Sequence, residues 1–230
     1  MLKINNLIGF SNQKNSGTGG SSPTIIPSDY SGLIFWCDAD AGLASLSNTD
    51  PISTWNATVG SSPTQTGSAR PTKNVVSGKN AAVFAAQSLI LGTTLDPSTD
   101  FTAFAKVYRG STTFRAPILG NFANDNPVLY QLNNGLVYCV TATRYTYANC
   151  SATGWNTYIF TSSGASIAIY LNGVALTLTS NTAVSSPNPL NGLGVARSDR
   201  GTFSLRSVGW YNRVLNSTEI SDLNTYLTNL

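Results

Sequence analysis

Residues 201–230 have the sequence GTFSLRSVGWYNRVLNSTEISDLNTYLTNL, and this stretch decides the fold. Its first half, 201–215, has the apolar and aromatic content that predicts the last strand of a sheet. Its second half predicts a helix, because Asn216 can cap the first turn while Glu219 reaches back three residues later. Four apolar residues recur at helical spacing, and we expect them to pack on the sheet: Ile220, Leu223, Leu227 and Leu230.

Upstream of this stretch the sequence alternates between apolar runs and turn residues. The segments SGLIFWCDA (31–39) and AAVFAAQSLIL (81–91) each predict one strand. FTAFAKVYR (101–109) predicts another, with one face formed by Phe101, Ala103, Ala105 and Val107. Asn-Gly pairs at 134–135 and 172–173 separate further apolar runs, and such pairs favour the type I′ turns of β-hairpins.

Composition agrees with an all-β chain and excludes several classes of function. Charged residues are only 10% of the chain, and the thirteen Lys and Arg are scattered, so no basic patch indicates nucleic-acid binding. Histidine is absent and the three cysteines lack C-x-x-C spacing, so no metal site is expected. For Cys139 and Cys150, a bridge across a hairpin and buried thiols both stay open, with thiols favoured.

The first 22 residues differ from the rest of the chain. An apolar hook precedes the tract SNQKNSGTGGSS (11–22), whose composition is that of a flexible tether. We expect the hook to anchor the chain to a partner, although a frayed terminus is an even alternative. No apolar run is long enough to span a membrane or to form a signal-peptide core, so neither a membrane partner nor general secretion is expected. The anchoring residues of the hook are Leu2, Ile4, Leu7, Ile8 and Phe10.

Several segments together carry a family resemblance. They are WNTYIF (155–160), IYLNGV (169–174), GVARSDRG (194–201) and the terminal strand and helix, preceded in order by LIFWCDADAG, STWN and ARPT. From residue 28 to 230 the chain resembles the concanavalin A-like lectin/glucanase superfamily, in the laminin G-like branch of bacteriophage virion and bacterial surface proteins. The resemblance implies one all-β domain, a two-sheet antiparallel jelly-roll sandwich with a short C-terminal helix, and the first 22 residues add an extended N-terminal arm. It also places the four tryptophans in the core.

Catalytic residues are not expected. Glycoside hydrolases of the superfamily use paired carboxylates, whereas this chain has a single glutamate, Glu219, in the predicted helix. Asp38 and Asp40 form the closest carboxylate pair, but we favour a hydrogen-bonded turn for them over an acid/base dyad or a calcium site. Without histidine, Ser-His-Asp and Cys-His catalysis are excluded. Lyase chemistry by a tyrosine base beside Arg or Lys stays open, but nothing in the sequence singles out such a set. The sequence therefore predicts no enzyme and no cofactor.

The better candidate segment for contact with a sugar ligand is TRYTYANC (143–150). An extended segment here places two tyrosine rings on one face, beside a guanidinium and an amide that can hydrogen-bond sugar hydroxyls. An ordinary cross-strand aromatic pair is the favoured alternative. The candidate ligand-binding residues are Arg144, Tyr145, Tyr147 and Asn149.

The hook, the tether and the resemblance together predict a non-enzymatic bacteriophage virion protein. Its arm would bind other virion proteins of the capsid or tail, and its lectin-like domain would decorate the virion surface or hold host surface glycans. A bacterial carbohydrate-binding module, extracellular or on the cell surface, is the main alternative, and a glycan-degrading enzyme ranks last. Self-association into a homo-oligomer stays open.

Overall fold

The computed structural model describes most of the chain beyond its first 24 residues, and for a few strands it describes the backbone alone. The described ranges are 25–111, 116–121, 126–131, 136–140, 144–150, 152–163, 166–183, 189–194 and 201–230. Side chains are not described at 126–131, 136–140, 144–147, 149 and 179–183. The predicted anchoring hook and tether lie outside the described residues, so the arm and the domain boundaries stay predictions.

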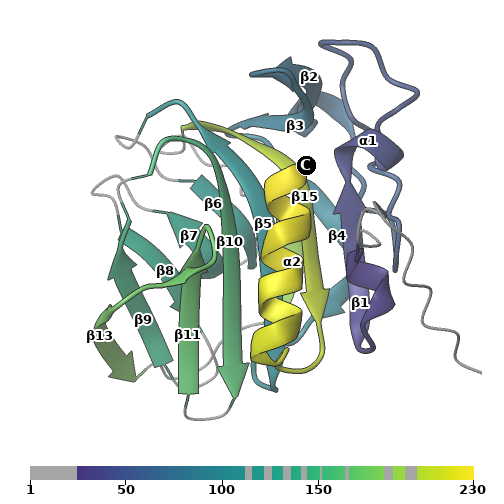
Figure 1. The fold of residues 1–230 in the computed structure, drawn as a ribbon. Helices are drawn as coiled ribbons and strands as arrows, with labels where there is room; N and C mark the ends of the chain where they lie inside the picture. The colour runs from purple at the N-terminus through teal and green to yellow at the C-terminus, as the bar shows by residue number, and fades with distance from the viewer. Residues whose placement is uncertain are drawn as a thin grey trace, which may run out of the picture.

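Two antiparallel sheets pack face to face, which confirms the predicted all-β sandwich (Figure 1). Sheet A runs in the order β12 (Val174–Ala175), β11 (Ser166–Leu171), β10 (Gly154–Ser163), β5 (Phe101–Arg109), β15 (Thr202–Tyr211), β3 (Lys79–Ala85) and β2 (Thr72–Val76), and β1 (Leu33–Asp38) also pairs with β15. Sheet B runs in the order β13 (Leu178–Ala183), β9 (Arg144–Asn149), β8 (Leu136–Val140), β7 (Asn126–Gln131), β6 (Ala116–Asn121), β14 (Leu190–Leu193) and β4 (Leu89–Leu95). Short helical turns occur at η1 (Pro27–Asp29), α1 (Ala39–Gly42) and η2 (Gly67–Ala69).

The main core lies between the sheets. Strand β5 contributes the predicted face of Phe101, Ala103, Ala105 and Val107, all of which belong to this core. The ring of Phe101 stacks on that of Trp210, with centroids 4.2 Å apart. Packing of this kind makes aromatic side chains the largest contributors to a sandwich core.

Three of the four tryptophans are core residues, as predicted. Trp36, Trp55 and Trp210 are each at least 96% buried. Trp155 is half-buried instead, and its Nε1 donates a hydrogen bond to the Val76 carbonyl at 3.1 Å. It lies edge-to-face with Tyr108 rather than between the sheets.

Helix α2 (Ser217–Asn229) covers the outer face of sheet A and creates a second core (Figure 1). The predicted capping box is present, since the Asn216 side chain accepts from Thr218 N and Glu219 N while Glu219 accepts from Asn216 N. Ile220, Leu223 and Leu227 are buried beneath the helix, and Leu230 packs at the edge of the same cluster. The helix therefore covers a face of sheet A that would otherwise be exposed to solvent.

One predicted strand is wrong in its extent. The run 81–91 belongs to two strands, β3 in sheet A and β4 in sheet B, rather than to one. The chain changes sheets through Ala86, which has a φ of 61°. A continuous apolar run cannot reveal such a change, because both strands bury their side chains in the same core.

The strand register also shows that Cys139 and Cys150 cannot form a disulfide. Cys139 in β8 pairs with Thr146 in β9, four residues before Cys150. At about 3.3 Å per strand residue the two cysteine Cα atoms are roughly 13 Å apart, which is beyond disulfide reach. Cys37 and Cys150 are buried thiols, as favoured from the sequence. The Cys150 sulfur lies 3.6 Å from the Tyr158 hydroxyl.

Candidate functional site

The residues predicted to bind a ligand lie on β9, between β8 and β13 in sheet B. Backbone register places Tyr145 opposite Val140 and Tyr147 opposite Tyr138. The side chains of Arg144, Tyr145, Tyr147 and Asn149 lie outside the described residues. Their role in ligand binding therefore stays a prediction.

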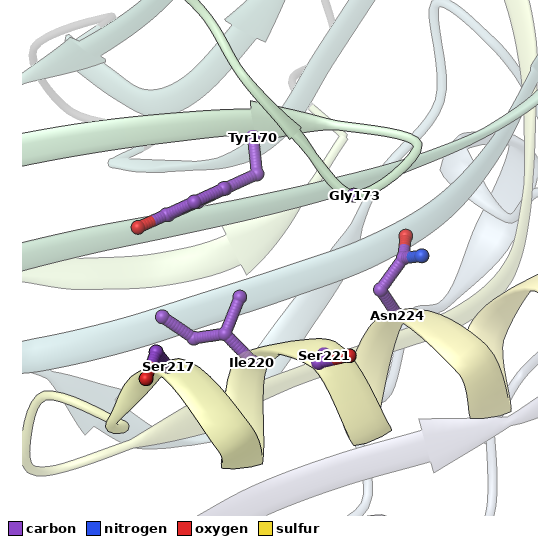
Figure 2. A pocket seen from close by; sticks show the side chains of 6 residues that line it. All are labelled: Tyr170, Gly173, Ser217, Ile220, Ser221 and Asn224. Atoms are coloured by element: carbon purple, nitrogen blue, oxygen red, sulfur yellow. The ribbon is translucent and has the colours of Figure 1, made fainter.

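A different site is built between the β11–β12 hairpin and helix α2 (Figure 2). This hairpin–helix groove has a volume of about 170 Å³. The hairpin supplies Tyr170 and Gly173, and α2 supplies a row spaced by three and four residues, which places its members on one face of the helix. The helical lining residues are Ser217, Ile220, Ser221 and Asn224.

The hairpin wall is fixed by its turn. Asn172 and Gly173 have φ values of 50° and 81°, as a type I′ turn requires, and this confirms the hairpin predicted from the Asn-Gly pair. Asn172 N donates to the Thr157 carbonyl and Asn172 Oδ1 accepts from Thr157 N, both at 2.9 Å. These bonds tie the turn to β10 in the middle of sheet A.

The helical wall is tied to the same strand. Thr157 Oγ1 donates to Asn224 Oδ1 at 2.7 Å. A Cβ placed on Gly173 would lie only 2.6 Å from Asn224 Nδ2, so the turn and the amide are in close contact. With its oxygen engaged by Thr157, Asn224 has its Nδ2 beside Gly173.

The start of α2 is held by an ion pair. Arg213 donates from Nη1 and Nη2 to the two carboxylate oxygens of Glu219, at 2.8 and 2.7 Å. The hydrogen-bonded guanidinium holds the pKa of Glu219 below its ordinary value. This arrangement fixes the helix end that carries Ser217.

The groove combines one aromatic ring with uncharged polar groups. Tyr170 lies along the groove across from Ile220, with its hydroxyl directed toward the Ser217 end of the helix (Figure 2). Two exposed serine hydroxyls and the Asn224 amide complete the lining. An apolar face with a few placed hydrogen-bonding groups is the usual composition of a small-molecule site. Sequence reasoning missed this site, because the Asn-Gly pair was taken only as a turn.

Asp38 and Asp40 form a capped turn, as favoured from the sequence. Asp38 Oδ1 accepts from Asp40 N at 2.9 Å, and Asp38 is the N-cap of α1. Burial raises the pKa of Asp38. Burial also opposes ionisation of Asp40, but hydrogen bonds from Arg206 and Asn80 hold the pKa of Asp40 below its ordinary value. Within the described part of the chain, no three Asp, Glu, Cys or His residues gather as a metal site.

No protein-family model matches the chain, and none of the curated proteins is significantly similar to it in sequence. Solved structures do match. Sialidase of Trypanosoma rangeli bound to sialic acid aligns with a TM-score of 0.60 at 16% identity over 89% of this chain. The binding domain of botulinum neurotoxin serotype D/C aligns with a TM-score of 0.54 at 11% identity, covering 85% of this chain and 52% of that one. The chain spans about a third of the sialidase, 35% of its length.

These similarities support the β-sandwich fold, and the superfamily assignment stays a resemblance. They overturn the prediction that the chain is not an enzyme, because the fold forms part of a sialidase, including one solved as a covalent intermediate. The prediction rested on the need for paired carboxylates. Glycosidases without such a carboxylate pair exist, so its absence does not exclude an enzyme. No helix in the described ranges is long and apolar enough to cross a membrane.

Proposed function

We propose that the chain is a glycan-binding domain whose hairpin–helix groove holds one sugar residue. The observation that carries the proposal is the Tyr170 ring, which lies across from a row of hydroxyl and amide groups on α2. An aromatic face covers the C–H face of a pyranose, while hydroxyls and amides hydrogen-bond its hydroxyl groups. The volume of about 170 Å³ supports a single ring, since a cavity of roughly 150 Å³ holds one benzene.

A site of this size binds weakly by itself. A monosaccharide has about 12 non-hydrogen atoms, and at about −0.3 kcal/mol per atom its binding free energy is roughly −4 kcal/mol, a Kd near 1 mM. Adhesion through such a site depends on many copies, which gain avidity on a repeating surface. The proposed domain therefore acts in an array, displayed on a particle or a cell.

A glycan array with the full chain tests the proposal. The double variant Ser217→Ala/Ser221→Ala should lose array binding, because both hydroxyls line the groove and both residues are exposed, so folding is unaffected. The matched control is Thr218→Ala, an exposed helix residue outside the lining. Binding that survives the double variant would exclude the groove. Sugar release from the bound glycans is assayed in parallel, because the fold occurs in a sialidase.

The predicted site on β9 is tested on the same array. Tyr145→Ala and Tyr147→Ala should leave binding unchanged if the groove holds the glycan. Loss of binding in these variants, together with retention in the groove double variant, would move the site to sheet B.

We propose further that this glycan-binding domain is displayed on a bacteriophage virion, with a bacterial cell surface as the alternative. It is supported by the hook and tether in the sequence of residues 1–22 and by the need for many copies. Mass spectrometry of purified particles, with and without deletion of residues 1–22, tests it. Stoichiometric presence that is lost on deletion supports anchoring by the arm, and absence from particles leaves a free glycan-binding module.

A further inference from the structure

We propose that the hairpin–helix groove selects neutral sugars and rejects sugars that carry a carboxylate or a sulfate. This inference rests on the proposed function and adds the class of ligand. None of the six described lining residues is charged; they are Tyr170, Gly173, Ser217, Ile220, Ser221 and Asn224. These described residues offer hydroxyl and amide hydrogen bonds, and none of them offers a cation for an acidic group.

Charged groups around α2 are engaged elsewhere. Arg213 is bound through both Nη atoms to Glu219. Asp222 accepts from the Tyr30 hydroxyl at 2.6 Å, on the side of η1. At the other end of the helix, Lys106 Nζ donates to the Thr228 carbonyl at 3.5 Å and Lys79 Nζ to the Leu230 carbonyl. These contacts account for each of the named groups without placing a charge in the groove.

The helix N-terminus is not available to an anion either. An uncapped N-terminus attracts carboxylates because its first N–H groups lack partners. Here Asn216 Oδ1 accepts from Thr218 N and Glu219 N, each at 3.0 Å. The carboxylate of Glu219 also accepts from Asn216 N at 2.8 Å, so this N–H group at the helix start has a partner as well.

Desolvation then separates the two classes of sugar. A hydroxyl that enters the groove exchanges water for a serine hydroxyl or the Asn224 amide at little cost. A carboxylate that enters loses its hydration shell and gains no cation, and this cost is much larger. Rejection by an unpaired charge is a common source of binding specificity.

The test compares a neutral oligosaccharide with its sialylated form, titrated calorimetrically against the full chain. We expect the neutral form to bind about tenfold more tightly or better, given the cost of an unpaired charge. Ser221→Lys should narrow or reverse this ratio, because it places an ammonium at the exposed rim of the groove. The matched control is Thr225→Lys, which adds the same charge to an exposed helix position outside the lining and should leave the ratio unchanged.

The outcomes separate this inference from the proposed function. Equal binding of both forms, lost in Ser217→Ala/Ser221→Ala, would overturn the selectivity and leave the groove as the glycan site. An unchanged ratio in Ser221→Lys, or the same shift in Thr225→Lys, would overturn the electrostatic explanation. If both oligosaccharides bind equally well to the wild type and to Ser217→Ala/Ser221→Ala, or if neither binds at all, the proposed site is wrong and this inference fails with it.

Discussion

Thr157 in β10 donates its hydroxyl hydrogen to Asn224 Oδ1 of helix α2 at 2.7 Å. This bond joins the central part of sheet A to the helix that covers it, at the point where the β11–β12 turn also approaches. Thr157 is 99% buried. The same residue bonds the Asn172 main chain and side chain, so it positions both walls of the groove.

Thr157→Val should lower the stability of the fold and weaken glycan binding. Valine keeps the shape of threonine but removes the donor, which leaves Asn224 Oδ1 without this partner at a cost of about 1 kcal/mol. Urea denaturation measures the loss. Thr225→Val is the control, because the Thr225 hydroxyl bonds the Ser221 carbonyl on an exposed helix surface and its removal should cost under about 0.5 kcal/mol. Equal losses in both variants would contradict the positioning role.

Asp38→Asn should stabilise the protein at neutral pH. Asp38 is 5% exposed, and its Oδ2 has no hydrogen-bond partner among the described residues. Burial raises the pKa of Asp38 in the folded state, so protonation of this carboxyl is more favourable in the folded state than in the unfolded state. The charge therefore destabilises the fold above the folded pKa, and we expect the variant to gain on the order of 1 kcal/mol at pH 7. This gain should shrink as the pH falls toward the ordinary carboxyl pKa of about 4.

Asp40→Asn is the control, because it should change the stability at pH 7 in the opposite direction. The hydrogen bonds from Arg206 and Asn80 hold the pKa of Asp40 below its ordinary value, so its charge stabilises the fold at pH 7 and its loss should destabilise it. Urea midpoints at pH 7 and pH 4 measure both variants. A less stable Asp38→Asn at pH 7 would show that the charge of Asp38 is favourable despite its burial.

Glu219→Gln should destabilise the protein in a pH-dependent way. The bond from Arg213 lowers the pKa of Glu219 in the folded state, so the charge contributes stability above the unfolded pKa of about 4.3 and loses it as the pH falls through the folded value. Glutamine keeps a side-chain acceptor for Asn216 N but loses the ion pair, at a cost of about 1 kcal/mol at pH 7. A double-mutant cycle with Arg213→Gln checks the cause, because the two losses should not add.

Local signals explain which parts of the fold could be predicted. The alternation of 101–109 and the Asn216–Glu219 capping box are written in neighbouring residues, and both occur as predicted. The Asn-Gly pair at 172–173 fixed a hairpin for the same reason, since positive φ values demand those residues. By contrast, the change of sheets at Ala86 depends on the pairing of distant strands.

The groove could not be predicted from such signals. Helical spacing identified the buried face of α2, but Ser217, Ser221 and Asn224 looked like ordinary solvent-facing residues. Their significance comes from Tyr170, which is far away in the sequence and is brought opposite by the packing of α2 on β10. Buried apolar residues follow a period, whereas a site lined by exposed serines and one amide has none.

Gly173→Ala should disrupt the groove more than the turn alone would require. Gly173 has a φ of 81°, and a Cβ there would lie 2.6 Å from Asn224 Nδ2. Gly78 has nearly the same φ, 79°, but its Cβ would meet nothing within 4 Å. Both alanine variants carry the strain of a left-handed residue, about 1 kcal/mol. Only Gly173→Ala also pushes the Asn224 amide away. This variant should therefore lose more stability in urea than Gly78→Ala does. It should also lose glycan binding, whereas Gly78→Ala should retain glycan binding. Equal behaviour of the two variants would show that the contact between the turn and Asn224 does not shape the site.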